Sequence, residues 1–136
     1  MFMAWKWVGF MSTTVASLTA LRTLDASENQ LSALPSSLAA LEHLESLVLN
    51  GNPLEFSAVI CELTALKNLN LSKAKVSSVP EGVGRLAALE RLQLNGNRLS
   101  VLPRSVMQLP LLAFVDVSSN ELTTLPDFSG AARLRA

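Results

Sequence analysis

The chain has 136 residues, a length typical of one domain. Its 11 Lys and Arg residues are balanced by 11 Asp and Glu residues, so the formal net charge is zero. A neutral chain lacks the basic stripe that nucleic-acid binding requires and the polybasic segment that holds a protein on an anionic membrane. Apolar residues make up 49% of the chain and aromatic residues only 5%, so we expect a core of aliphatic side chains.

Residues 1–14 form an apolar N-terminal segment that lies outside the repeating part of the chain. Its apolar run is about eleven residues long and contains Lys6, whereas a transmembrane helix needs about 20 apolar residues, so we expect no membrane span. A signal peptide matches poorly because no basic region precedes the apolar run. Two interpretations remain open. Either Trp5, Trp7 and Phe10 cover the end of the first repeat, or the segment is an artefact of the gene model.

Residues 15–136 read as one repetitive domain. The frame L-x-x-L-x-L-x-x-N-x-L-x-x-L-P-x-x-L-x-x-L-x-x begins at residues 21, 44, 66, 89 and 112, in steps of 23, 22, 23 and 23 residues. Val15 and Leu18 match the end of a preceding unit, and Leu134 matches the first leucine of a further unit that stops at once. We expect about five repeats, truncated at the C-terminus. Uncapped repeats at the two ends suggest end-to-end association.

Each repeat predicts a strand, a turn and a short return segment. In the first repeat Leu24 and Ala26 alternate with polar residues, which is typical of a half-buried strand. Pro35 then opens the return segment, where a proline at the first helical position loses no needed N–H group. Leu38 and Leu41 follow at a spacing of three, giving this segment one apolar face. A single unit cannot bury its leucines, so the repeats must stack around one core.

The asparagine of the frame predicts a structural ladder at the turn. A side-chain amide has donors and an acceptor, so it can satisfy backbone groups that leave the strand ladder. The asparagines in this position are Asn29, Asn52, Asn97 and Asn120. Ala74 takes the position in the third repeat, and unpaired backbone groups there would cost about 1–3 kcal/mol. The second repeat is one residue short, with the deletion between Leu54 and Phe56 and with Ser57 in the proline position.

The outward strand positions form the candidate binding face. They fall into three columns: Thr23, Ser46, Asn68, Arg91 and Phe114; Asp25, Val48, Asn70, Gln93 and Asp116; Ser27, Asn50, Ser72, Asn95 and Ser118. Arg91, Phe114 and Asp116 stand out from a small, polar background, because an aromatic beside an arginine is typical of an interface anchor. We add Gln93 and Asn70 as neighbouring partner-binding candidates. The competing interpretation is that Arg91 pairs with Asp116 while Phe114 shields the C-terminal end.

The projected size of this face limits its affinity. Five strands at ~4.8 Å spacing and four residues per strand give a patch of roughly 300 Å². A standard interface buries about 800 Å² on each partner, so edge loops or further repeats must contribute.

Catalytic chemistry is not predicted. His43 is the single histidine and lies in a return segment, away from the strand-face serines that a catalytic triad would need. Gly82-Val83-Gly84 lacks the Gly-Lys-Ser/Thr ending of a phosphate loop and reads as a permissive turn. Carboxylates at metal-binding spacing are missing, so we expect no catalytic residues, cofactor or metal. The single cysteine, Cys61, excludes an intrachain disulfide and favours a reducing, cytoplasmic setting.

The run L-P-S-S-L-A-A-L-E-H-L-E-S-L-V-L-N-G-N-P-L, residues 34–54, resembles the intracellular leucine-rich repeat proteins of the Ras-suppressor and Ras-scaffold kind. The resemblance covers residues 15–134 and implies an α/β fold. This fold would be a right-handed solenoid with a parallel β-sheet on its concave face and short helical or extended return segments on its convex face. It also implies a non-enzymatic scaffold or adaptor in signalling that binds a protein partner through the strand face.

Two alternatives stay open beside that function. In the first alternative, the chain is a recognition fragment of a larger signalling enzyme, such as a kinase, a phosphatase regulator or a ubiquitin ligase. Otherwise it is a fragment of a secreted receptor, which predicts an upstream signal sequence and cysteine-bearing caps.

Overall fold

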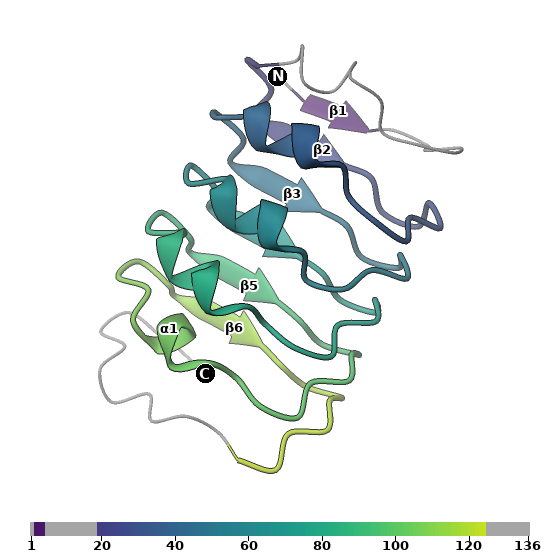
Figure 1. Ribbon diagram of the computed structural model, residues 1–136, viewed down its shortest axis with the longest axis vertical. Helices are drawn as coiled ribbons and strands as arrows, with labels where there is room; N and C mark the ends of the chain where they lie inside the picture. The colour runs from purple at the N-terminus through teal and green to yellow at the C-terminus, as the bar shows by residue number, and fades with distance from the viewer. Residues whose placement is uncertain (1, 5–18, 125–136) are drawn as a thin grey trace.

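A computed structural model describes residues 2–4 and 19–124 of the chain. The described chain coils so that each turn adds one short strand to a single parallel sheet (Figure 1). The strands are β1 (Phe2–Ala4), β2 (Thr23–Asp25), β3 (Ser46–Val48), β4 (Asn68–Asn70), β5 (Arg91–Gln93) and β6 (Phe114–Asp116). They lie in the sheet in the order of the sequence.

The strand register follows the repeat frame. From β2 to β6, the central residues that pair across the sheet are Leu24, Leu47, Leu69, Leu92 and Val115. The 22-residue step of the second repeat is absorbed without a shift, because Leu47 still pairs with Leu69. The predicted α/β solenoid with a parallel sheet is therefore confirmed.

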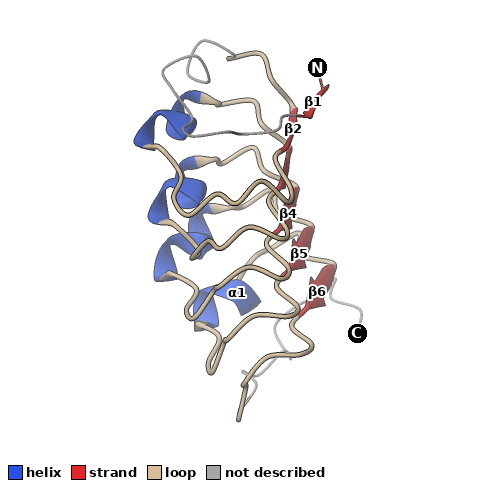
Figure 2. Cartoon of the chain, turned by 90° about the vertical axis from the view of Figure 1, so that its right-hand side faces the viewer, coloured by secondary structure: helices blue, strands red, loops and turns tan. Residues whose placement is uncertain are grey.

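The return segments lie on the opposite side of the coil from the strands (Figure 2). Three of them are 3₁₀ helices: η2 (Ser36–Ala40), η3 (Ala58–Glu62) and η4 (Glu81–Arg85). The fourth, α1 (Arg104–Met107), is a single α-helical turn. The sheet bows so that its outer face is the concave side of the molecule (Figure 2).

The leucine spacing explains the 3₁₀ geometry, because side chains three residues apart line up in a helix with three residues per turn. Leu38 is buried in η2, and the Leu41 N–H donates to the Leu38 carbonyl. The structure places Pro35 at the N-cap, one residue before the helical position that we predicted for it. Ser57 holds the equivalent N-cap of η3, where its hydroxyl accepts a hydrogen bond from the Val59 N–H.

The core is a continuous stack of aliphatic side chains between the strands and the return segments. Burying one leucine contributes about 1.5–3 kcal/mol, so the stack accounts for the cohesion between repeats. Fully enclosed members include Leu21, Leu44, Leu66 and Leu89 at the start of successive repeats, and Leu24, Leu47, Leu69 and Leu92 in the strands. In the last described repeat Val115 and Val117 are only partly buried.

Asn52 and Asn97 lie on the side of the turns that faces the core. Each forms hydrogen bonds with the backbone of two repeats. The Asn52 Oδ1 accepts hydrogen bonds from the N–H groups of Asn29 and Leu31, and its Nδ2 donates to the carbonyls of Ala26 and Leu49. The equivalent bonds of Asn97 join the third and fourth repeats, with partners Ala74, Val76, Leu71 and Leu94. Each buried amide therefore ties one coil to the preceding one.

The other two asparagines of the frame lie in the same position. The Asn120 Oδ1 accepts from the Leu99 N–H, and its Nδ2 donates to the Leu94 and Val117 carbonyls. The Asn29 Nδ2 donates to the Ser27 carbonyl. At Ala74 the backbone compensates in part, since the Leu54 N–H donates to the Asn52 carbonyl at 2.8 Å. The vacant asparagine position therefore leaves fewer unpaired groups than the sequence alone implied.

The N-terminal segment contributes a strand that the sequence did not predict. Residues 2–4 form the strand β1, which pairs in parallel with β2 and places Met3 beside Leu24. Trp5, Trp7, Phe10 and the expected repeat start at Leu134 lie outside the described residues.

The two glycines of the third return segment correct an expectation. Gly82 and Gly84 lie inside η4 and are not a turn. A β-carbon on Gly82 would meet the Cys61 Sγ at 3.3 Å, and one on Gly84 would meet the Ser105 Cβ at 3.3 Å. Their physical role is the close packing of neighbouring return helices. Within the described ranges, no helix has the length and apolar character needed to cross a membrane.

Candidate protein-binding surface

The outward side chains of the strands form continuous columns on the concave face. Cross-strand pairing places Asn68, Arg91 and Phe114 side by side in one column. Asn70, Gln93 and Asp116 are side by side in the next column. The five residues predicted to bind a partner thus lie in three adjacent strands, β4 to β6.

Arg91 and Phe114 form the main feature of this surface. The Arg91 guanidinium carbon lies 4.2 Å from the centroid of the Phe114 ring, which is a cation–π contact. Arg91 is exposed and Phe114 is half-buried. The described residues include no ion pair between Arg91 and Asp116, so the pairing that competes with an interface anchor is not formed. The exposed Arg91 guanidinium therefore lies over the Phe114 ring and partly covers it.

The side chains of Asp116 and Asn70 accept hydrogen bonds in the turns that follow their strands. The Asp116 Oδ1 accepts hydrogen bonds from the Ser118 hydroxyl at 2.6 Å and from the Ser118 N–H at 3.0 Å. These bonds lower the pKa of Asp116. Asn70 makes the same pair of contacts with Ser72. Both side chains stabilise a turn, so their role on the binding face is secondary to that of Arg91 and Phe114.

Two asparagines on this face were not among the predicted site residues. The Oδ1 atoms of Asn68 and Asn95 are buried, and in the described part of the chain they have no hydrogen-bond partner. The Asn68 amide group donates to the Ser46 hydroxyl at 3.1 Å. A buried acceptor without a donor is costly, so these two groups lower the stability of this part of the sheet. The only sequence signal was their place in the outward columns beside Arg91 and Gln93.

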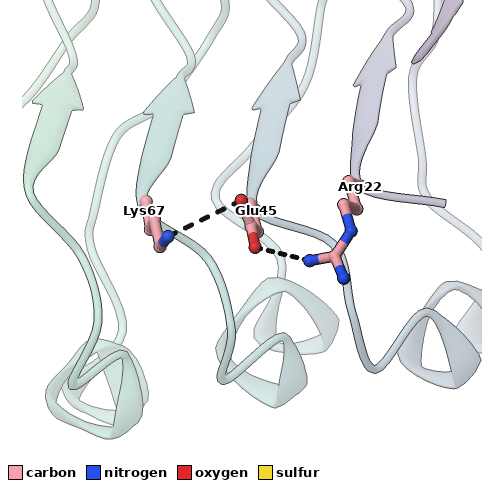
Figure 3. Close-up of polar contacts among 3 residues, drawn as sticks. All are labelled: Arg22, Glu45 and Lys67. Atoms are coloured by element: carbon pink, nitrogen blue, oxygen red, sulfur yellow. Dashed lines mark hydrogen bonds and ion pairs between the residues drawn. The ribbon is translucent and has the colours of Figure 1, made fainter. Parts of the chain in front are cut away.

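A chain of opposite charges borders the face where the strands begin (Figure 3). The Glu45 carboxylate lies 2.7 Å from the Arg22 Nη1 and 3.6 Å from the Lys67 Nζ. These residues immediately precede β2, β3 and β4. The Glu45 carboxylate offsets part of the positive charge on this border, whereas Arg91 at the start of β5 has no ion-pair partner in the described residues.

The residues that could carry chemistry are spread over the described part of the chain. Among residues 2–4 and 19–124, no group of three or more His, Cys, Asp or Glu residues is close enough to hold a metal ion. His43 is exposed on the return side of the coil. Cys61 is buried in η3, and this burial raises the pKa of its thiol, which makes it a poor nucleophile.

Two family models match most of the described chain. The model described as Leucine rich repeat matches residues 64–122, and the model described as Leucine Rich repeats (2 copies) matches residues 19–60. No match was found among the curated proteins.

Similar solved structures come from bacteria and plants. A leucine-rich repeat protein from Leptospira interrogans is 31% identical with a TM-score of 0.86, and an internalin from Listeria monocytogenes is 26% identical with a TM-score of 0.76. The leucine-rich repeat ectodomain of a membrane receptor kinase from Arabidopsis thaliana, solved in complex with CASPARIAN STRIP INTEGRITY FACTOR 2, is 26% identical with a TM-score of 0.82.

These likenesses extend over almost all of this chain and over a small part of each neighbour. The matches cover 91%, 93% and 96% of this chain, and 32%, 37% and 16% of the three neighbours in the same order. The repeat frame, the parallel sheet and both family models agree. The chain belongs to the leucine-rich repeat proteins.

Proposed function

We propose that this chain is a protein-recognition module that binds its partner through the concave strand face, with Arg91 and Phe114 as the anchor. Leucine-rich repeat folds generally mediate protein–protein interaction, and such domains are typically not enzymes. The observation that carries the proposal is the 4.2 Å stacking of an exposed Arg91 on Phe114. Arginine and aromatic residues dominate binding energies at interfaces, because they combine large contact area with directional polar groups.

The size of the face determines what else must take part. A strand face of roughly 300 Å² is much smaller than the ~800 Å² per partner of a standard interface. The partner must therefore also contact the turns at an edge of the sheet. Gln93 and Asn70, which pair across β4 and β5, supply polar contacts beside the anchor.

Affinity capture with matched variants tests the proposal. The test variant combines Arg91→Glu with Phe114→Ala. The control combines Arg104→Glu in α1 with Val101→Ala in the loop before it, which changes one exposed arginine and one apolar side chain away from the strands. We expect the wild-type chain and the control to capture the same proteins and the test variant to lose them. Retention of those proteins by the test variant would refute the anchor.

The adaptor role and the compartment are part of the proposal. The resemblance to Ras-suppressor and Ras-scaffold proteins supports a signalling adaptor. A free, buried Cys61 and the absence of a second cysteine support a cytoplasmic location. Imaging of a tagged chain in its source cells tests this location, and an extracellular signal would contradict it.

A second candidate function rests on the length of the neighbours. The chain spans about a third of the two bacterial structures and about a sixth of the plant receptor ectodomain. This difference supports a recognition segment within a larger signalling protein. The encoding locus discriminates the two candidates, because an in-frame catalytic domain after Ala136 favours the second.

A further inference from the structure

Three cations gather on the edge of the solenoid that is formed by the turns after the strands. Lys73 and Lys75 flank Ala74 in the third repeat, and Arg98 follows Asn97 in the fourth. All three side chains are exposed. The ion pairs of the described residues involve Arg22, Lys67 and Arg85, so none of the three turn-edge cations is neutralised by such a pair.

Hydrogen bonds to the backbone hold the two turns against each other. The Asn97 Oδ1 accepts a hydrogen bond from the Ala74 N–H at 3.1 Å, and the Arg98 N–H donates to the Val76 carbonyl at 2.9 Å. Lys73 lies directly over the next turn, since its Cγ would be 3.2 Å from a β-carbon on Gly96. Equivalent residues of stacked coils are about 4.8 Å apart. The three charges therefore belong to one compact cluster, the basic turn edge.

The basic turn edge is bounded by acidic or uncharged residues along the same edge. The positions equivalent to Lys73 are Glu28, Gly51, Gly96 and Ser119, and those equivalent to Lys75 are Gln30, Pro53, Arg98 and Glu121. Glu121 is next to Arg98 in this column but forms no ion pair with it among the described residues. Along these two columns of the turn edge, positive charge is thus confined to the third and fourth repeats, on a chain whose net charge is zero.

We propose that the basic turn edge, formed by Lys73, Lys75 and Arg98, binds an acidic segment of a protein partner through its carboxylates. Charge complementarity of this kind steers association and selects partners. An acidic peptide fits better than nucleic acid, because three cations bounded by Glu28 and Glu121 do not form the extended basic stripe that a phosphate backbone needs. The inference uses a different surface from the Arg91–Phe114 anchor and does not depend on it.

The test measures binding of a fluorescent hexaglutamate peptide to the full 136-residue chain by anisotropy at low ionic strength. The test variant is Lys75→Gln with Arg98→Gln. The control, Arg85→Gln with Arg104→Gln, removes the same charge from the return side. A charge contact at 4 Å in water is worth about a factor of five, so we expect at least a tenfold weaker affinity for the test variant. We expect less than a twofold change for the control.

Lys73→Gly supplies a second variant that separates binding from folding. It removes one charge at a position where glycine suits the backbone, so we expect weaker peptide binding without loss of thermal stability. Added salt should weaken wild-type binding. The proposal is overturned if the wild-type chain does not bind the peptide. Equal losses in the test and control variants, or tighter binding of a single-stranded DNA of matched charge, would overturn it as well.

Discussion

Lys73 lies over Gly96, with its Cγ 3.2 Å from the place that a β-carbon on Gly96 would occupy. Glu28 and Gly51 repeat this relationship at 2.7 Å. All four residues immediately precede the asparagine position of the frame and have positive φ angles, as does Ser119. The turn therefore demands a left-handed residue in every repeat, and a side chain in one repeat is accommodated by glycine in the next.

Lys73→Gly should stabilise the protein. Lys73 has φ 51°, a left-handed conformation that costs a non-glycine residue about 1–2 kcal/mol. The greater entropy of glycine in the unfolded chain offsets part of the gain, so we expect about 1 kcal/mol more free energy of unfolding in urea.

Gly96→Ala is the reciprocal control for the same turn. Its φ of 72° and the nearby Lys73 side chain both oppose a β-carbon, so we expect a loss of about 1–2 kcal/mol. If Lys73→Gly lowered the stability or Gly96→Ala left it unchanged, the left-handed turn would not have the energetic role assigned to it.

The vacant asparagine position predicts a stabilising change at Ala74. Ala74→Asn provides an amide for the turn that joins the second and third repeats, and we expect a gain of about 1 kcal/mol. The gain is limited because the Leu54 N–H already donates to the Asn52 carbonyl. Calorimetric melting measures the change, and an unchanged melting temperature would contradict a vacant position.

Asn97→Ala tests the reverse change at an occupied position. Asn97 is buried, accepts hydrogen bonds from two backbone N–H groups and donates to the Leu71 and Leu94 carbonyls. Leaving these groups unpaired should cost at least about 2 kcal/mol in urea unfolding. A smaller loss would mean that water replaces the amide at little cost.

We expect the ion pairs of Glu45 to make a small, salt-dependent contribution to the free energy of unfolding. Glu45→Gln removes the carboxylate that pairs with Arg22 and Lys67. These side chains are largely solvated, so the free energy of unfolding should fall by less than about 1 kcal/mol. The difference should vanish in about 1 M salt, which screens exposed charges. A loss that persists in high salt would show that Glu45 acts through packing.

The raised pKa of the buried Cys61 thiol leads us to expect a loss of stability at alkaline pH. Burial raises the pKa of its thiol above the ordinary value of 9.0, Arg85 lowers it in part, and Glu62 raises it further. The folded chain therefore keeps the proton at a pH where the unfolded chain ionises. Its contribution to stability is complete below pH 9.0 and is lost as the pH rises through the folded pKa.

Unfolding of wild type and Cys61→Ala across this pH range measures that contribution. The stability difference between them should shrink at the alkaline end. Iodoacetamide should also alkylate the native thiol far more slowly than the thiol of the denatured chain. Equal alkylation rates in the two states would contradict the buried, protonated thiol.

The sheet and its register could be predicted because the leucine positions are spaced by the geometry of the coil. Leu24, Leu47 and Leu69 must face one core, and this places their outward neighbours in columns. The strand β1 was missed because Met3 lies outside the leucine frame, and its step of 21 residues to Leu24 differs from the other steps.

The details of the binding face depend on side-chain geometry that the repeat does not encode. The frame places Arg91 beside both Phe114 and Asp116, and only the structure shows that Arg91 stacks on the ring. Asp116 is engaged by Ser118 two residues later, a contact that depends on the turn after β6. The predicted position of Pro35 in the return helix differs by one residue from the observed N-cap, because an N-cap and a first helical residue have similar sequence signals.

The most direct test of protein recognition by the concave face is a nuclear magnetic resonance titration of the isotope-labelled chain with a captured partner. The Gln93 side-chain amide in β5 reports on the concave face, and that of Gln108 at the end of α1 reports on the return side. We expect the Gln93 amide and the Arg91 Nε–H resonances to shift while the Gln108 amide stays unchanged. Shifts at Gln108 with unchanged Gln93 and Arg91 resonances would contradict binding through the strand face.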